Sequence, residues 1–206
     1  MKRIVTRLLD QFGLYTPARS LFHRHIRSNE QWARVVMNQE TRKLLNDIEP
    51  EKLQVLEISG RFWSQQIKFG SYQTFDYPKF DICKDVLEQQ FDLVLAEQVS
   101  EHLQSPHQAA RNVYQMLREG GYFLITTPFL IRVHNVPIDC TRWTEQGLKN
   151  FLSECGFDQT RIQSNSWGNR ACVKANFSKW INYRPHLHSL KNEPDFPVVV
   201  WALAQK

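Results

Sequence analysis

Two apolar runs in the middle of the chain constrain its fold most strongly. The first covers residues 91–103 (FDLVLAEQVSEHL) and the second covers residues 117–129 (LREGGYFLITTPF). Each run opens with a turn signal, continues as a short apolar stretch and ends in polar residues. This pattern is typical of parallel strands in a doubly wound sheet, whose carboxyl ends form a ligand crevice. The sequence therefore predicts an α/β fold with a mostly parallel sheet.

These runs resemble the fourth and fifth strands of class I S-adenosylmethionine-dependent methyltransferases. In that family FDLV…EH(L) is followed by L(K/R)xGG, an apolar strand and TP, and the resemblance spans residues 55–157 of this chain. It implies a small, trimmed member of the methyltransferase type 11-like group, with a Rossmann-like sheet closed by a C-terminal antiparallel hairpin. It also implies a methyltransferase whose cofactor is S-adenosylmethionine.

The other elements are predicted from hydrophobic periodicity and turn residues. We expect one domain over residues 1–206, in which a helical cap (1–50, with a break at 13–17) precedes a Rossmann-like core (51–206). Strands are expected at 54–60, 71–75, 80–82, 91–96, 121–127, 159–165 and 198–204, and helices at 29–48, 105–117 and 145–155. Thr144 is expected to cap the last helix and Gly156 to end it. The span from residue 60 to 91 is too short for all the crossover helices of the family.

Composition and charge favour a globular cytoplasmic protein. The formal net charge is +5, but the basic residues are scattered, so nucleic acid is a less favoured partner than a small molecule. Lys2 and Arg3 resemble the start of a signal peptide, but Arg7 and Asp10 interrupt the apolar stretch. No window approaches the roughly 18 apolar residues that a membrane span needs. The four cysteines are widely spaced without a C-x-x-C pair, which indicates reduced thiols rather than disulfides or a zinc site.

The resemblance places the methionine moiety of the cofactor at Glu57, Ser59 and Gly60. A tight turn is needed there, because side chains would block the cofactor, and free backbone N–H groups would bind its carboxylate. Only Gly60 remains of the glycine-rich loop of the family. Taken alone, the motif would be better explained by an ordinary strand-to-helix turn.

Three further acidic residues are expected to contact the ribose, the adenine and the sulfonium of the cofactor. Asp76 follows Gly60 by sixteen residues, near the spacing of about 20 at which dinucleotide-binding folds place an acid on the ribose hydroxyls. The alternative for Asp76 is a carboxylate that caps a turn. The resemblance assigns Asp81 to the exocyclic amine of the adenine and Ile82 to its ring. Glu97 is expected where the chain passes the positive sulfonium, which favours acidic neighbours.

Two histidines are candidates to take a proton from the methyl acceptor, because an imidazole with a pKa of about 6.5 can act as a base near neutral pH. His102 follows the strand expected at 91–96, and His134 lies in the loop at 127–144 (TPFLIRVHNVPIDCTRWT). This loop resembles the H-x-x-P-x-D-x-x-R-W/F-T segment of methyltransferases in glycan and natural-product pathways. The resemblance implies that His134, Asp139 and Arg142 line the acceptor pocket, with Asp139 fixing the tautomer of His134. His102 could instead cap the following helix.

Two tryptophans complete the candidates for substrate binding. Trp143 belongs to the same loop motif, and Trp167 lies in a segment at 165–180 that is rich in Trp, Asn and Arg. Such side chains could stack on a sugar or ring, or simply pack over the sheet edge.

Three functions remain open from the sequence. The first is methyl transfer to an oxygen or nitrogen of a small molecule or sugar, by a monomer or a homodimer. The second is a binding protein with a catalytically degenerate methyltransferase fold, because the glycine loop is thinned. The third is a metal-assisted RNA-terminal 2′-O-methyltransferase, because Glu97, Glu101, His102 and His134 resemble the metal ligands of those enzymes. The second downstream histidine of that pattern is not matched, so we expect no metal.

Overall fold

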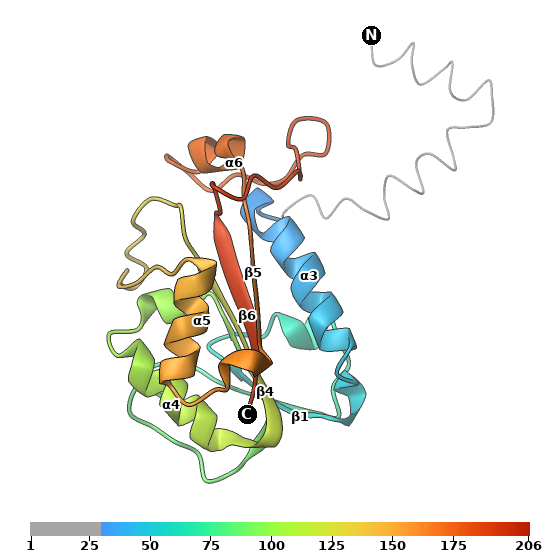
Figure 1. Ribbon diagram of the computed structural model, residues 1–206, viewed down its shortest axis with the longest axis vertical. Helices are drawn as coiled ribbons and strands as arrows, with labels where there is room; N and C mark the ends of the chain where they lie inside the picture. The colour runs from blue at the N-terminus through green and yellow to red at the C-terminus, as the bar shows by residue number, and fades with distance from the viewer. Residues whose placement is uncertain (1–29) are drawn as a thin grey trace, which may run out of the picture.

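Figure 1 shows the computed structural model, which describes residues 30–206. A six-stranded sheet has the order β2-β1-β3-β4-β6-β5, parallel from β2 to β4 and antiparallel where β6 pairs with β4 and β5. The strands are β1 (Gln54–Ile58), β2 (Ser71–Phe75), β3 (Phe91–Glu97), β4 (Leu117–Pro128), β5 (Ile162–Trp167) and β6 (Val199–Gln205). The expected sheet with a C-terminal antiparallel pair is confirmed. The helix predicted to start the cap lies outside the described residues.

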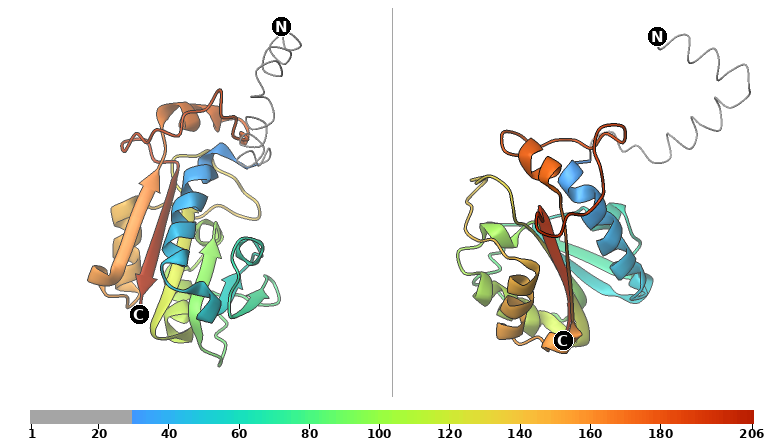
Figure 2. Two further views of the ribbon diagram at one scale, coloured as in Figure 1. Left: turned by 90° about the vertical axis from the view of Figure 1, so that its right-hand side faces the viewer. Right: turned by 45° about the horizontal axis from the view of Figure 1, so that its top comes forward.

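Helices cover both faces of this sheet, which explains why its central strands are apolar on both sides. Leu93 and Leu95 of β3 pack on one face with Leu45 of α3, whereas Val94 packs on the other face with α4 and α5. Figure 2 shows α3 on one side of the sheet and α4 with α5 on the other. The α-helices are α3 (Val35–Asn46), α4 (Pro106–Met116), α5 (Glu145–Glu154) and α6 (Arg170–Ala175). The 3-10 helices are η1 (Trp32–Arg34), η2 (Pro50–Lys52), η3 (Trp63–Gln65), η4 (Ser100–His102) and η5 (Gln159–Arg161).

The ends of α5 follow the residues that predicted them. The Thr144 hydroxyl accepts a hydrogen bond from the backbone N–H of Gly147 at 3.0 Å, as an N-cap does. Gly156 follows the helix with φ +114°, a conformation that favours glycine. The short helix α6 was not predicted, although Asn169 caps it in the same way by accepting from the Cys172 N–H at 2.8 Å.

The strand expected at 80–82 is wrong. Phe80 and Ile82 are buried in the main core, but their backbone forms a turn, in which the N–H groups of Lys84 and Asp85 both donate to the carbonyl of Asp81. Burial of alternate side chains from a turn therefore imitates the pattern of a strand. Because this strand is absent, the run at residue 91 forms the third strand of the chain rather than the fourth.

The connections in the first half of the sheet are short, as expected. Only η3 lies between β1 and β2, and residues 76–90, which are all described, contain no helix. The other strand boundaries differ modestly from expectation, since β4 begins at Leu117 and β5 begins at Ile162 after η5.

The strand order gives the sheet a topological switch point between β1 and β3. The chain leaves β1 for β2 on one side and returns to β3 on the other, so the connections diverge at the carboxyl ends of β1 and β3. Doubly wound sheets bind ligands at such a switch point. The segment between α6 and β6 reaches the start of η1 at this end, where the Trp32 N–H donates to the Ile181 carbonyl at 2.8 Å (Figure 2).

Candidate functional site

The loop after β1 folds around the buried carboxylate of Glu57. Oε1 accepts from the backbone N–H of Phe62 at 3.1 Å, and Oε2 accepts from the N–H of Trp63 at 3.2 Å and the hydroxyl of Tyr72 at 2.5 Å. A Cβ atom added to Gly60 would lie 2.6 Å from Oε1. Glycine is therefore required here because the carboxylate of Glu57 fills the space that a side chain would need.

The backbone turns sharply where β1 and β3 end. Ser59 and Gln98 have φ values of 53° and 55°, in the left-handed region. Residues other than glycine rarely adopt it, and such conformations cluster at ligand sites. The N–H of Ser59 donates to the Phe75 carbonyl at 2.9 Å and that of Gln98 to the Thr126 carbonyl at 3.0 Å, so the neighbouring strands hold both turns. No sequence signal identified Gln98.

The residues expected at the ribose and adenine occupy different environments. Asp76 is exposed directly after β2. The carboxylate of Asp81 accepts from the Cys83 N–H at 3.1 Å and pairs with Lys84 at 2.9 Å, and this hydrogen-bonded lysine holds the pKa of Asp81 below its usual value. Ile82 is buried and lines an apolar cavity of about 20 Å³ between the sheet and α4. That cavity has room for a water-sized group only.

Glu97 ends β3 at the switch point, and its side chain is only 6% exposed. Arg34, just before α3, donates to Oε1 at 3.3 Å, whereas Oε2 has no hydrogen-bond partner within residues 30–206. Burial raises the pKa of Glu97 to about 7, although the charge of Arg34 opposes this rise. Sequence reasoning missed Arg34, because nothing in its local pattern links the start of α3 to the carboxyl ends of the strands.

A pocket of about 150 Å³ opens at the carboxyl ends of β3 and β4. Its walls come from η1 and the residue before it, from η4, from the loop after β4 and from the segment before β6. The lining residues are Gln31, Ala33, Arg34, Gln98, Glu101, His102, Pro128, Ile131, His134, Trp180, Val198 and Val199. Both expected histidines therefore lie in one pocket beside Arg34, the partner of Glu97.

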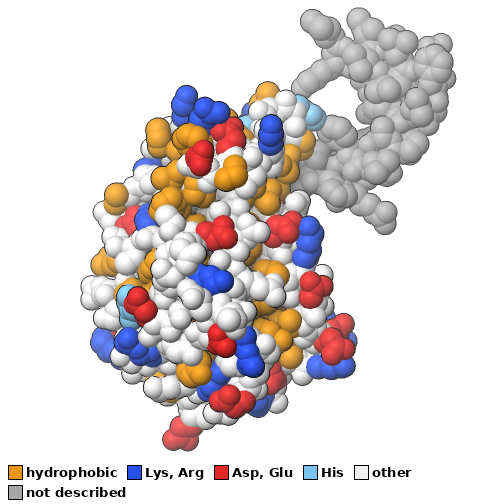
Figure 3. All heavy atoms as spheres, in the orientation of Figure 1, with side chains coloured by type: hydrophobic (Ala, Val, Ile, Leu, Met, Phe, Trp, Pro, Cys, Tyr) orange, Lys and Arg blue, Asp and Glu red, His pale blue; other side chains and the backbone are white. Residues whose placement is uncertain are grey.

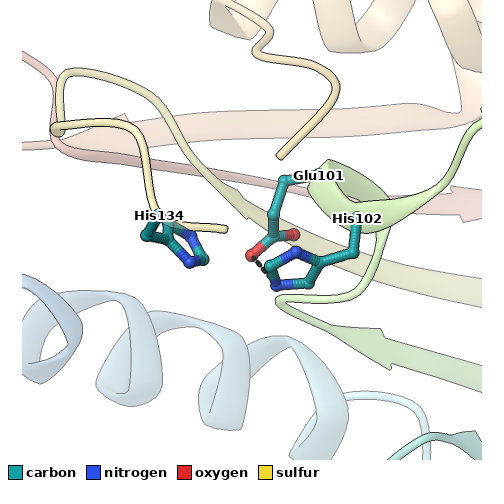
Figure 4. A group of neighbouring side chains, drawn as sticks. All are labelled: Glu101, His102 and His134. Atoms are coloured by element: carbon teal, nitrogen blue, oxygen red, sulfur yellow. Dashed lines mark ion pairs between the residues drawn. The ribbon is translucent and has the colours of Figure 1, made fainter. Parts of the chain in front are cut away.

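Three side chains of this pocket converge, as Figure 4 shows. One ligand-type atom from each of Glu101, His102 and His134 lies within 4.8 Å of the other two. The rings of His102 and His134 are edge to face at 4.9 Å. Burial raises the pKa of Glu101 to about 7, and burial together with the neighbouring His102 lowers the pKa of His134.

The ring of His102 has a fixed tautomer. Its Nδ1 lies 2.5 Å from the carbonyl oxygen of Ile138, and since a carbonyl can only accept, Nδ1 must carry the proton. The lone pair of the neutral ring is then on Nε2, which lies 3.7 Å from Oε1 of Glu101.

Asp139 does not orient the ring of His134, so that expectation is wrong. Its carboxylate forms a two-point pair with the guanidinium of Arg142 and accepts from the backbone N–H of His134 at 2.8 Å. Burial opposes the charge on Asp139, but Arg142 still holds its pKa below the usual value. Asp139 and Arg142 thus fix the backbone of the loop that carries His134.

Trp143 and Trp167 pack within the fold, whereas Trp180 lines the pocket. Trp167 is 2% exposed and its indole N–H donates to a backbone carbonyl at 3.0 Å, so its expected contact with substrate is wrong and the packing alternative holds. Trp143 packs on a ring of α5. Trp180 was not singled out from the sequence, although it ends the segment at 165–180. Its ring centre lies 5.5 Å from that of His134, and the guanidinium of Arg132 lies over its face at 4.5 Å.

The four-residue metal pattern considered for RNA-terminal enzymes is not reproduced. Three residues separate Glu97 from Glu101, whereas two separate the glutamates of the E-x-x-E-H motif in those enzymes. Glu97 binds Arg34 and is outside the convergent group, which among residues 30–206 consists of Glu101, His102 and His134.

The surface agrees with the scattered charge of the sequence. On the face drawn in Figure 3, basic and acidic side chains alternate without a continuous basic stripe. No helix in the described part of the chain has the length and apolar character that crossing a membrane requires.

Comparison with solved structures places the fold among methyltransferases. An S-adenosylmethionine-dependent methyltransferase from Mesorhizobium loti has a TM-score of 0.52 at 18% identity, over 80% of this chain and 96% of that one. A possible histamine N-methyltransferase from Thermotoga maritima has a TM-score of 0.53 at 14% identity, over the full length of both chains. The N-methyltransferase NodS from Bradyrhizobium japonicum, in complex with S-adenosylhomocysteine, has a TM-score of 0.50 at 13% identity, over 82% and 86%.

Comparison at the level of sequence gives the family directly. No curated protein matches the chain. A family model described as a methyltransferase domain matches residues 6–192, which is most of the sequence. The chain therefore belongs to the class I S-adenosylmethionine-dependent methyltransferases.

Proposed function

We propose that this protein transfers a methyl group from S-adenosylmethionine to an oxygen or nitrogen of a small molecule or sugar. The observation that carries the proposal is the pocket of about 150 Å³ beside the switch point, which holds His102 and His134 together. Its small volume favours a compact acceptor over a polymer strand. The four free cysteines support a reducing, cytoplasmic setting.

The cofactor would lie along the carboxyl ends of β2, β1 and β3. In this arrangement the loop at Ser59 and Gly60 faces the methionine moiety. Glu57 holds that loop in place through its hydrogen bonds to the backbone. The exposed Asp76 accepts from the two ribose hydroxyls, because one carboxylate can accept a hydrogen bond from each.

The adenine and the sulfonium of the cofactor would contact residues that follow β2 in the chain. Asp81 and Ile82 flank the adenine, at the mouth of the small apolar cavity. The buried carboxylate of Glu97 faces the sulfonium, whose positive charge it stabilises.

Methyl transfer is an in-line displacement. A lone pair of the acceptor attacks the methyl carbon, the S–CH₃ bond breaks and its electron pair remains on sulfur, which yields S-adenosylhomocysteine. Positioning supplies most of the rate, but an O–H or N–H acceptor also loses a proton. His134 is the proposed proton acceptor, because its lowered pKa keeps the imidazole neutral at pH 7. Arg142 and Trp143, from the same loop, are proposed to contact the acceptor.

Calorimetric titration with S-adenosylmethionine and S-adenosylhomocysteine tests the first half of this proposal. A screen of amines, phenols and sugars with radiolabelled methyl donor tests the second half. Cofactor binding with labelled product supports the enzyme. Absence of cofactor binding refutes the enzyme and favours the degenerate binding protein. Cofactor binding without product from any of these compounds rejects these classes as acceptors.

A further inference from the structure

We propose that Glu101, His102 and His134 bind one divalent transition-metal ion in the acceptor pocket. The place of the ion rests on the geometry of these three side chains alone. Its effect on methyl transfer rests on the proposed function. The inference departs from the expectation, drawn from the sequence, that no metal is present.

The distances suit ligands of one ion. The potential ligand atoms lie within 4.8 Å of one another, and His102 Nε2 is 3.7 Å from Glu101 Oε1. The latter distance is too long for a hydrogen bond. It is close to the roughly 3.4 Å that separates two ligands with bonds of about 2.1 Å around a tetrahedral ion. The 4.8 Å limit of the whole group is wider than this separation, so binding of an ion would require the side chains to rotate and draw the three atoms together.

The orientation of His102 is that of a metal ligand. A coordinating histidine usually donates its second ring N–H to a carbonyl or carboxylate, which fixes the tautomer and aims the free nitrogen at the metal. The Nδ1–H of His102 donates to the Ile138 carbonyl, and Nε2 faces Glu101. The backbone of the acceptor loop therefore aims the lone pair of Nε2 toward the pocket.

Within the described residues, the carboxylate of Glu101 has no cationic partner closer than His102, whose Nε2 lies 3.7 Å from Oε1. The side chain of Glu101 is 1% exposed, and Oε2 has no hydrogen-bond partner in that part of the chain. The nearby guanidinium groups already have acceptors, since Arg34 donates to Glu97, Arg142 to Asp139 and Arg132 to the Asn176 carbonyl. A buried carboxylate without a partner is costly, and a bound cation would remove that cost.

The set of ligands indicates the kind of ion. One carboxylate and two imidazoles suit Zn²⁺, Mn²⁺ or Fe²⁺, whereas Mg²⁺ prefers oxygen ligands. Three protein ligands leave coordination positions open toward the pocket, where an acceptor oxygen could bind and lose its proton more readily. In that case His134 acts as a metal ligand rather than as a free base, and the proton leaves through solvent.

Metal titration of the full-length chain tests this inference. The protein is first treated with chelator, and Zn²⁺, Mn²⁺ and Mg²⁺ are then titrated by calorimetry, with Co²⁺ absorption as a report of the ligands. We expect one Zn²⁺ or Mn²⁺ per chain, with Mg²⁺ much weaker. His134→Ala should weaken binding at least 10-fold, and Glu101→Gln should weaken it further while keeping the shape of the side chain.

His107→Ala is the matched control, because this half-exposed histidine lies 3.3 Å from Glu154 outside the pocket. Its loss should leave metal affinity unchanged. Absence of binding to the wild-type chain, or equal affinity in His134→Ala, overturns the inference. A parallel titration with S-adenosylmethionine in chelator keeps the two proposals separate: cofactor binding without metal binding rejects only the ion, and metal binding without cofactor binding rejects only the enzyme.

Discussion

Replacing Gly60 with alanine tests how the loop after β1 is built. The added Cβ would lie 2.6 Å from Oε1 of Glu57 and 3.4 Å from its Cδ, and this carboxylate cannot move freely, because its side chain is buried and hydrogen-bonded. Oε1 accepts from the Phe62 N–H, and a hydrogen bond to a charged group contributes about 1.5–3 kcal/mol. Losing this bond, with strain on those to Oε2, should lower the free energy of unfolding by about 3 kcal/mol.

Urea unfolding followed by tryptophan fluorescence measures this loss. For a chain of this length, about 3 kcal/mol corresponds to a fall in Tm of roughly 6–12 °C. Affinity for S-adenosylmethionine should fall at least 10-fold, because the displaced loop no longer offers its backbone to the cofactor.

Tyr72→Phe serves as the control, because it removes one donor to Glu57 and adds no atom. Tyr72→Phe should lower the free energy of unfolding by about 1.5–3 kcal/mol. Gly60→Ala and Tyr72→Phe both act through Glu57, so together they should cost less than the sum of the two. A Gly60→Ala protein whose stability stays within about 0.5 kcal/mol of wild type, the range of neutral surface changes, would refute the role given to this carboxylate.

Four further substitutions test other parts of the site and fold. Asp76→Ala should weaken S-adenosylmethionine binding about 10-fold or more by calorimetry, since two ribose hydroxyls lose an acceptor worth about 1 kcal/mol each; unchanged affinity would remove Asp76 from the site. Burial raises the pKa of Glu97 to about 7, so its stabilising contribution is complete below about pH 4.5 and is lost as pH rises through 7. Glu97→Gln should therefore stabilise the protein by up to about 3 kcal/mol at pH 8 and by little at pH 4, and a difference independent of pH would contradict the shift. His134→Ala should lower turnover about 100-fold with cofactor affinity nearly unchanged, and full turnover would exclude His134 from the chemistry. Thr144→Ala should cost about 1 kcal/mol in thermal unfolding through loss of the cap on α5, and an unchanged Tm would contradict it.

The sequence predicted the central strands and α5 because their signals are local. Buried parallel strands are apolar throughout, and Thr144 and Gly156 have the residue types that helix ends require. The false strand at 80–82 shows the limit of this reasoning, because Phe80 and Ile82 alternate with polar residues for reasons of packing alone. Only the three-dimensional core determines whether such a pair belongs to a strand or a turn.

The sequence predicted those pocket residues that directly follow adjacent strands, but not those that reach the pocket through helix or loop packing. His102 and His134 follow adjacent strands, so the carboxyl-end rule brings them together. Arg34 reaches the pocket through the packing of α3, and Trp180 reaches it through the long segment between α6 and β6, which no local pattern places. Trp167 has the same composition around it as Trp180, but it ends β5 with its side chain in the core, and only strand register settles that.

Three buried glutamates at the carboxyl ends of neighbouring strands differ in how the protein satisfies them. Glu57 accepts from three donors of its own loop and of β2, so its charge shapes the backbone. Within residues 30–206, Glu97 has one guanidinium partner and one oxygen without a hydrogen bond, which suits its proposed role beside the sulfonium. Glu101 has no cationic partner at hydrogen-bonding distance among residues 30–206 and lies beside two imidazoles. Burial raises the pKa of Glu101 to about 7, so near neutral pH its carboxyl changes between a neutral form and a charged form that lacks a close partner. A cation bound in the pocket would stabilise the charged form, which gives Glu101 a role in ligand binding where Glu57 has one in structural support.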